Sequence, residues 1–365
     1  MPPHPARIGV YDILTKIAGG GMATIYLGRT VDPNGADRVA AIKVIKHELA
    51  HKDEFIQMFL DEAKILSLLH HPNINGTLQY GTSQDQHFIA MDLLLGRTLL
   101  DVWDAAVDKG IVLPIGLVAW ICAGVAHGLH YAHELKDEDG APLHVIHRDA
   151  NPSNGFLTYD GQVKRFDFGL AKSRGRRYVS QAGIIKGKMA YLSPEQIELL
   201  PLDRRSDVFT LGVTLWELTT MRRLFLRDTH LETVFAIRAG LVEDPREIVD
   251  GYPDALWTIL KRALEPDRDA RYATAQELAV ALDGFVGAEE AALMPARLGR
   301  LLDDLFVGER QRQMGWLKET SAFEASDSPV TMRPPAPMIP RVGDGLGAFG
   351  EADLAPDPLP PVVRR

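Results

Sequence analysis

Residues 147–154 read "HRDANPSN". This stretch has neither helical nor alternating strand periodicity, so we expect a polar loop. Asp149 and Asn154 lie in it, an acid that could orient a hydroxyl group and an amide whose oxygen could ligate a metal ion. A simple polar turn would contain the same residue types. The stretch therefore becomes informative only together with what precedes and follows it.

The composition excludes several classes of protein. The chain of 365 residues is long enough for two lobes with sizeable cores, and 46% hydrophobic and 24% charged residues are typical of globular proteins. A net charge of −9 disfavours a nucleic-acid partner, since phosphate binding requires clustered Lys and Arg. The single cysteine, Cys122, excludes an intrachain disulfide and fits a reducing cytosol. We expect a cytoplasmic protein.

One apolar stretch raises the question of a membrane. Residues 110–133 contain no Asp, Glu, Lys or Arg and are long enough to cross a bilayer. Pro114, several glycines and three histidines interrupt the stretch, and a polar loop follows it directly. These features favour a helix buried in a globular core. Residues 1–10 also lack the basic and apolar regions of a signal peptide, so we expect no membrane partner.

The chain divides into a β-rich part and a helical part. Residues 11–29, "YDILTKIAGGGMATIYLGR", alternate around a glycine-rich turn, and residues 38–46, "RVAAIKVIK", form a short apolar strand. Helical periodicity follows over residues 53–70 and dominates from about 97 onward. The pattern predicts an α+β fold with a small and a large lobe, and a cleft between lobes is a favoured ligand site.

The C-terminal part has a different composition. Residues 286–323 are amphipathic and predict a helical tail that could dock on the large lobe or bind a partner helix. Residues 324–365 are rich in Pro and Gly and cannot bury enough apolar area to offset the ordering entropy. We expect this last segment to be disordered.

Three further features could carry chemistry. The glycines at 19–21 would let backbone N–H groups approach a phosphate, although such a cluster is commonly just a turn. Lys43 lies among apolar strand residues and needs an anion, for which Glu62 on the next helix is the natural partner, unless both face solvent. Asp167 opens "DFG" at a strand end, a good position for an Mg²⁺ ligand.

Together with "SPE" (193–195), "RSDVFTLGVTLWEL" (205–218) and "RDARYATAQEL" (268–278), these motifs form an ordered set. The set resembles the protein-kinase fold, specifically the eukaryotic-like Ser/Thr kinases of bacteria. Each motif alone is weak, whereas six in order at compatible spacings are specific.

The resemblance spans residues 11–285, with a small lobe over 11–92 and a large lobe over 93–285. It implies transfer of the γ-phosphate of ATP, with Mg²⁺, to Ser/Thr hydroxyls of protein substrates, including the protein itself.

The resemblance also implies a role for each matching residue. Asp149 would accept or orient the proton of the substrate hydroxyl, and Lys43, paired with Glu62, would contact the α- and β-phosphates. Asn154 and Asp167 would hold Mg²⁺. The nucleotide would contact the glycine-rich loop, the adjoining strands, the hinge at 92–94 and the strand after the catalytic loop, which comprise Ile17, Gly19, Gly20, Gly21, Ile25, Ala41, Met91, Asp92, Leu94 and Phe156.

Two structural contacts follow from the same resemblance. Asp207 would accept backbone N–H bonds from the catalytic loop, although a simple helix N-cap would look the same in sequence. Glu195 and Arg271 would form an ion pair in the large lobe.

Several positions depart from the family pattern. Ala18 and Ala23 replace the outer glycines of the loop, Asn151 replaces a common lysine, and Lys188 replaces the usual threonine next to the catalytic aspartate. These departures motivate an alternative, a nucleotide-binding pseudokinase that acts as a signalling scaffold. If charge at the γ-phosphate limits the rate, Asn151→Lys should raise turnover.

The segment between Asp167 and Glu195 contains no threonine, although Arg148 implies a phosphorylated activation loop. Of the candidates Ser173, Tyr178 and Ser180 we favour Ser180, because a phosphate there could bond the nearby Arg176 and Arg177.

Overall fold

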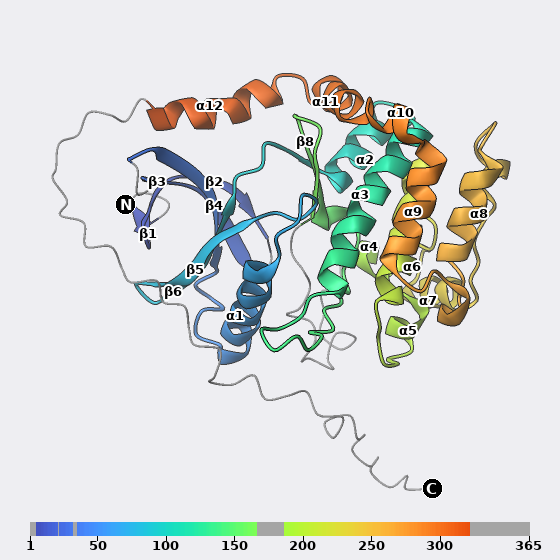
Figure 1. Cartoon of the computed structure of the whole chain (residues 1–365), viewed down its shortest axis with the longest axis horizontal. Helices are drawn as coiled ribbons and strands as arrows, with labels where there is room; N and C mark the ends of the chain where they lie inside the picture. The colour runs from blue at the N-terminus through green and yellow to red at the C-terminus, as the bar shows by residue number, and fades with distance from the viewer. Residues whose placement is uncertain (1–4, 21, 32–34, 166–185, 322–365) are drawn as a thin grey trace, which may run out of the picture. The chain divides into compact units, whose positions relative to one another are not determined.

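The computed structural model describes residues 5–20, 22–31, 35–165 and 186–321 (Figure 1). Met1–Phe323 form one compact unit and Glu324–Arg365 a second, and the described residues all belong to the first. The predicted disorder of residues 324–365 concerns a segment outside the described residues.

A six-stranded antiparallel sheet forms the small lobe, with strand order β1-β2-β3-β4-β6-β5. The central strand β4 is apolar and buried along most of its length, which fits its two paired neighbours. The strands are β1 (Arg7–Ile8), β2 (Tyr11–Gly19), β3 (Ala23–Val31), β4 (Asp37–Ile45), β5 (Thr77–Ser83) and β6 (Gln86–Asp92).

The alternation of side chains along β4 decides where its lysine lies. Ala41 and Ile45 belong to the apolar cluster that also contains residues of helix α1, whereas Ile42 and Val44 belong to a cluster on the other face. Because side chains alternate along a strand, Lys43 shares the α1 side with Ala41 and Ile45. The pleat of β4 thus directs its ammonium group toward α1.

Helix α1 (Asp53–Leu68) supplies the opposite side of this cluster. Its buried side chains are Phe59, Glu62, Ala63 and Leu66, a spacing of three and four residues that places them on one helical face. Asp53 and Glu54 lie in its first turn, where the helix dipole favours acidic residues. Glu62 is therefore carried into the interior by the apolar residues on either side of it.

The large lobe is mainly helical, with one three-stranded antiparallel sheet in the order β7-β8-β9. This arrangement confirms the predicted α+β, two-lobed fold. Its strands are β7 (Gly96–Thr98), β8 (Gly155–Thr158) and β9 (Val163–Arg165). Its helices are α2 (Leu99–Asp108), α3 (Ile115–His133), α4 (Lys186–Met189), α5 (Pro194–Ile197), α6 (Arg205–Thr220), α7 (His230–Arg238), α8 (Asp254–Ala263) and α9 (Ala275–Val286), with short 3-10 turns η1 (Pro152–Asn154), η3 (Pro245–Glu247) and η4 (Arg268–Ala270).

Helix α3 contains the apolar stretch that raised the question of a membrane. Among the described helices it alone is long and apolar enough to cross one, by length and composition. It packs against α6 and α9, and its residues join the main apolar cluster of the large lobe. Cys122 on this helix is fully buried, and burial raises the pKa of its thiol to about 12. The structure therefore has the core helix that the sequence predicts.

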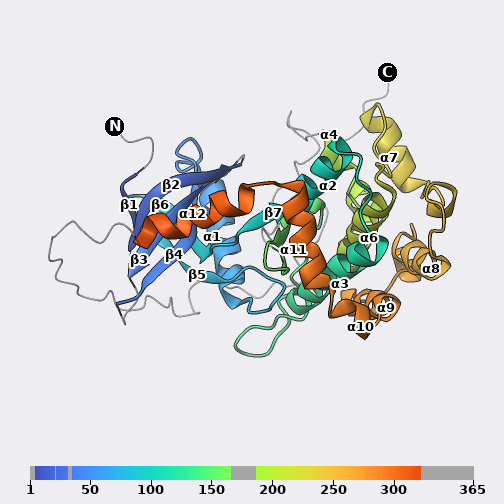
Figure 2. The ribbon, with the colours of Figure 1, turned by 90° about the horizontal axis from the view of Figure 1, so that it is seen from above.

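Three helices follow the large lobe: α10 (Ala288–Ala291), α11 (Met294–Leu305) and α12 (Glu309–Ser321). Figures 1 and 2 show α11 over α2 and α3, and α12 continuing across the small-lobe sheet, where it contacts β4. Leu298, Leu302 and Leu305 of α11 recur every three or four residues and join the core of the large lobe. The amphipathic tail therefore docks on the rest of the unit.

Close backbone contacts fix α11. A Cβ at Gly161 would lie 2.3 Å from the carbonyl oxygen of Pro295, and Gly161 has a φ of +83°, so glycine is required there. At the other end of α11, the Lys109 ammonium donates to the carbonyls of Asp304 and Leu305 at 3.1 and 2.7 Å. These carbonyls belong to the last turn of the helix, where no intrahelical N–H group is available to bond them.

Helix α12 binds the chain just after the predicted hinge. The amide of Gln313, which is 5% exposed, accepts from the Gly96 N–H at 2.8 Å and donates to the Gly96 carbonyl at 3.2 Å. Arg97 forms an ion pair with Glu309 and lies over the Phe306 ring at 4.9 Å. The tail is thus bonded to the first residues of β7, directly beyond residues 92–94.

Replacing Gln313 should show how much this contact contributes to the free energy of unfolding. Gln313→Ala leaves both backbone groups of Gly96 buried without their side-chain partner, so the free energy of unfolding should fall by about 1–3 kcal/mol. Gln311→Ala, an exposed position on the same helix, should change it by less than about 0.5 kcal/mol. Urea unfolding of both variants measures the difference, and equal stabilities would show that the contact contributes nothing.

Candidate functional site

The site begins with an ion pair inside the small lobe. The Lys43 ammonium lies 2.8 Å from Glu62 Oε1, and the two residues are 9% and 7% exposed. Two buried charges are tolerated when each neutralises the other and is hydrogen-bonded. The predicted pair is therefore present, and the alternative in which both side chains face solvent is wrong.

The glycine-rich turn joins β2 and β3. The Gly20 N–H donates to the Ala23 carbonyl at 2.9 Å, and among the described residues a Cβ on Gly20 would meet only that oxygen, at 3.8 Å. No described side chain therefore crowds the backbone at Gly20. Ala18 pairs with Ile25 in the β2–β3 register, so this departure from glycine lies within a strand. Gly21 is outside the described residues.

Most apolar residues assigned to the nucleotide lie together. Ala41 and Met91 are paired in the β4–β6 register and are buried in the cluster shared with α1. Ile17 and Ile25 pack against the same cluster and are only partly buried. Phe156 lies on β8 of the three-stranded sheet, opposite Thr98 of β7. The sheet of the small lobe thus gathers four of the six apolar candidates in one cluster.

The hinge starts at a tightly fixed residue. The Asp92 N–H donates to the Gly76 carbonyl at 2.9 Å, and the Asn75 side chain donates to the Asp92 carbonyl at 3.3 Å. A Cβ on Gly76 would lie 2.3 Å from Asp92 Oδ2, so a larger residue there would displace the Asp92 side chain. Within the described part of the chain the Leu94 N–H has no protein acceptor, so it is available to a ligand.

The catalytic-loop aspartate is held from several directions. Asn151 Nδ2 donates to Asp149 Oδ1 at 2.5 Å, and Asn154 Nδ2 donates to the Asp149 carbonyl at 2.9 Å and to Oδ2 at 3.3 Å. Arg165 also donates to the Asp149 carbonyl, at 3.0 Å. The Lys188 ammonium lies 3.5 Å from Oδ2, and the Asp149 side chain remains 14% exposed. The carboxylate is oriented and still accessible.

Asp207 fixes the backbone before this aspartate. Its carboxylate, 0% exposed, accepts from the His147 and Arg148 N–H groups at 2.8 Å each and bonds His133 Nε2 at 2.7 Å. The prediction that Asp207 binds the catalytic loop is confirmed. The N-cap alternative is wrong, since Arg204 occupies the N-cap of α6.

These bonds affect both charge and backbone conformation. Burial acts to raise the pKa of Asp207, but the hydrogen bond and charge of His133, with the charge and backbone N–H of His147, outweigh burial and hold that pKa below its ordinary value. The carboxylate therefore stays ionised at neutral pH. Arg148 has a φ of +63°, a conformation that costs free energy in a non-glycine residue. Its bond to Asp207 helps to maintain that conformation.

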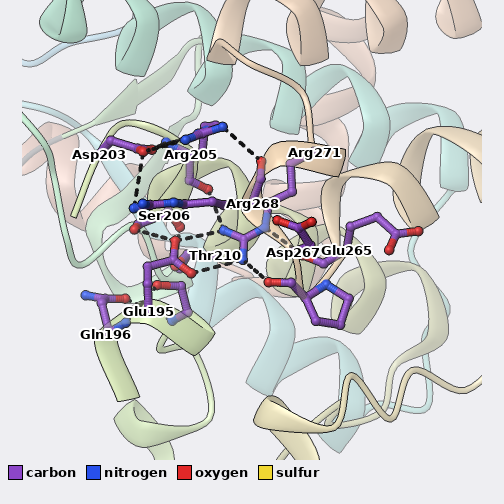
Figure 3. Close-up of polar contacts among 12 residues, drawn as sticks. Glu195, Gln196, Asp203, Arg205, Ser206, Thr210, Glu265, Asp267, Arg268 and Arg271 are labelled. Atoms are coloured by element: carbon purple, nitrogen blue, oxygen red, sulfur yellow. Dashed lines mark hydrogen bonds and ion pairs between the residues drawn. The ribbon is translucent and has the colours of Figure 1, made fainter. Parts of the chain in front are cut away.

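A second buried ion pair supports the loop from the large lobe. Arg271 donates to both oxygens of Glu195, at 2.8 and 2.9 Å, as Figure 3 shows, and the two residues are 2% and 4% exposed. Ser206 donates to the same carboxylate at 2.6 Å. The neighbouring Gln196 donates to the Arg148 carbonyl at 3.0 Å. Helix α5 thus connects the predicted ion pair, which is present, to the catalytic loop.

Removing Arg271 should be costly at neutral pH. Burial acts to raise the pKa of Glu195, but bonds from Arg271 and Ser206 and the charge of Arg271 lower it below 4.5. Its stabilising contribution is therefore present above pH 4.5 and is lost as pH falls through the lowered pKa. Arg271→Met should lower the free energy of unfolding by about 3–5 kcal/mol at pH 7, because a buried carboxylate loses its partner.

The matched control is Arg246→Met, in which an exposed arginine loses its pairs with Asp244 and Asp254. That change should cost far less, because solvent screens an exposed ion pair. The cost of Arg271→Met should shrink as the pH falls below 4.5 and through the lowered pKa of Glu195, as urea titrations at several pH values would show. A cost equal to the control at pH 7 would contradict the assignment.

Three predicted residues cannot be compared with the structure, and one buried residue of the site was not predicted. Asp167, Gly21 and Ser180 lie outside the described residues, so their roles stay predictions. Arg165, in contrast, is 1% exposed and bonds the Asp149 carbonyl, and sequence reasoning missed it. Its signal, one arginine at the end of a short strand, is the same as that of a solvent-facing residue. Only the fold, which places β9 beneath the loop, distinguishes the two.

Comparison with known protein families matches residues 11–281 to the protein kinase domain. The chain belongs to the protein kinase family. The tyrosine-protein kinase MasK of Myxococcus xanthus is 37% identical over 302 residues, which cover 83% of this chain and 47% of MasK. The serine/threonine-protein kinase PknL of Mycobacterium tuberculosis is 31% identical over 288 residues, which cover 79% of this chain and 68% of PknL.

A solved structure shows the same fold. The kinase domain of Mycobacterium tuberculosis PknI superimposes with a TM-score of 0.56 at 26% sequence identity, covering 76% of this chain and 97% of that domain. The predicted resemblance to bacterial eukaryotic-like kinases is confirmed. The kinase chain spans about half the length of MasK, 47%.

Proposed function

We propose that this kinase transfers the γ-phosphate of ATP to serine or threonine hydroxyls of protein substrates, itself included. The proposal is supported above all by the orientation and exposure of the Asp149 carboxylate. Its carboxylate is fixed by two asparagines and yet remains 14% exposed. A general base must be both oriented and accessible to the proton that it accepts.

The remaining residues support nucleotide binding. The open backbone at Gly20, the apolar surface of Ala41 and Met91, and the Leu94 N–H fit a phosphate chain and an adenine ring. Lys43, held by Glu62, offers a positive charge to the α- and β-phosphates. These are the groups that a nucleotide triphosphate requires from a protein.

The proposed metal site uses Asn154 and Asp167. The Asn154 amide nitrogen donates to Asp149, so its oxygen is the group available for a hard cation. Mg²⁺, when bound, would neutralise phosphate charge and orient the γ-phosphoryl group. The same asparagine would thus link the metal to the orientation of the base.

The proposed transfer of the γ-phosphate requires only the groups named above. The substrate hydroxyl oxygen attacks the γ-phosphorus, the bond from that phosphorus to the bridging oxygen of ADP breaks, and the hydroxyl proton passes to Asp149. ADP and the phosphorylated protein leave. The protein provides position and charge, without a covalent intermediate.

Tyrosine is a second candidate for the acceptor residue, because one relative is named a tyrosine kinase. MasK carries the name of a tyrosine kinase, whereas PknL and a 30% identical relative from Bacillus subtilis, PrkC, are named serine/threonine kinases. Lys188 lies next to Asp149, at the position where Ser/Thr kinases usually have threonine. We favour serine and threonine because the relatives with those names are several, and phosphoamino-acid analysis separates the two acceptors.

We also propose a cytoplasmic location, in keeping with the single buried cysteine. We propose in addition that a regulatory partner acts through the helical tail, whose helices α11 and α12 are docked on the kinase.

Asp149→Asn should slow phosphate transfer strongly while leaving nucleotide binding intact. With labelled ATP, Mg²⁺ and a generic basic protein, the variant should lose about 10²–10⁴-fold in rate, since general-base catalysis contributes that much. Its affinity for ADP should match that of the wild type. Mass spectrometry of the products would report Ser180 and any other autophosphorylated residue.

Each outcome of this assay separates the alternatives. Phosphoserine or phosphothreonine supports the proposal, and phosphotyrosine favours the second acceptor. Nucleotide binding without transfer by either protein would overturn the enzyme and leave the pseudokinase scaffold.

A further inference from the structure

The side chain of Asn151 forms its hydrogen bonds within the catalytic loop. Asn151 is 2% exposed, its Nδ2 donates to Asp149 Oδ1, and its Oδ1 accepts from the Ser153 N–H at 2.9 Å and hydroxyl at 2.5 Å. It thereby caps the turn η1. These bonds engage both the nitrogen and the oxygen of its amide within the loop, so Asn151 orients the base and brings no positive charge to a phosphate.

Among the described residues, a lysine from another part of the large lobe approaches that base. Lys188 of α4 places its ammonium 3.5 Å from Asp149 Oδ2, the oxygen opposite the one that Asn151 holds, and its side chain is 47% exposed. An exposed pair at this distance contributes less than about 1 kcal/mol to stability. Folding alone is therefore a weak reason for a lysine here.

The backbone that carries Lys188 is firmly anchored. Met189, Ala190 and Tyr191 follow it and are buried, and the Tyr191 carbonyl accepts from Thr210 Oγ1 at 2.9 Å. The Tyr191 hydroxyl donates to Glu217 at 2.5 Å. The ammonium group thus extends beside the base from a segment that is anchored in the large lobe by the buried residues after it, which favours a preorganised charge.

We propose that Lys188 supplies the γ-phosphate with the cation that the catalytic loop lacks at position 151. The positive charge is then supplied from position 188 and not from position 151. Asn151 in the loop orients Asp149, and Lys188 in α4 carries the charge. This inference rests on the proposed function. As the hydroxyl oxygen attacks, charge spreads over the γ-phosphoryl oxygens, and a fixed ammonium next to the base stabilises that charge.

This assignment changes the expectation for Asn151→Lys. In the wild-type background this change removes the bond to Asp149 and the cap of η1, and adds a second cation near Lys188, so turnover should fall. In a Lys188→Thr background the same change returns a cation to the site. The double variant should therefore be at least about tenfold more active than Lys188→Thr alone.

The test combines turnover with nucleotide affinity. Lys188→Met should lower kcat by about 10- to 100-fold, the size expected for one preorganised charge. It should weaken binding of the non-hydrolysable ATP analogue with an imido β–γ bridge, and leave ADP affinity unchanged. Lys188→Arg should retain most of the activity, and Lys261→Met, an exposed lysine on α8, should match the wild type in every measurement.

The outcomes distinguish this inference from the proposed function. Wild-type kcat in Lys188→Met, or equal losses of affinity for ADP and the analogue, would overturn the role of Lys188. If the wild type transfers no phosphate at all, the proposed function fails, and the ratio of analogue to ADP affinity still decides whether Lys188 contacts the γ-phosphate. Should Lys188→Met fail to fold, Lys188→Thr with and without Asn151→Lys gives the same decision.

Discussion

The buried carboxylate of Asp207 is the constraint on which the catalytic loop depends. It is 0% exposed and so must be satisfied by hydrogen bonds, which it receives from His133 and from two consecutive backbone N–H groups. Those bonds hold Arg148 at a φ of +63° and direct the next residue, Asp149, out of the core. The orientation of the base is therefore determined by a residue far from it in sequence.

Other parts of the large lobe converge on the same loop. Gln196 bonds the Arg148 carbonyl, Arg165 bonds the Asp149 carbonyl, and Lys188 approaches the Asp149 carboxylate. Each comes from a different element, and α5 is itself anchored by the buried Glu195–Arg271 pair. The small lobe contributes the separate Lys43–Glu62 pair. A docked tail reaches the first residues after the hinge through Gln313.

The sequence predicts these features unevenly, for physical reasons. Lys43 and Glu62 are predictable because a charge in an apolar strand needs a partner and the next helix offers one. The contact between Lys188 and Asp149 is not, since the two are separated by 39 positions and only tertiary packing brings them together. Arg165 and Gln313 are missed because buried polar residues that bond backbone groups have the same composition as exposed ones. The amphipathic tail could be predicted to pack, but not where.

Amide hydrogen exchange in the loop tests the role of Asp207 most directly. If its carboxylate fixes the loop, Asp207→Asn should speed exchange of the His147 and Arg148 amides by at least about tenfold, because a neutral amide oxygen is a weaker acceptor than a carboxylate. Exchange in the small lobe should be unchanged. Equal protection of these two amides in the variant and the wild type would contradict the account.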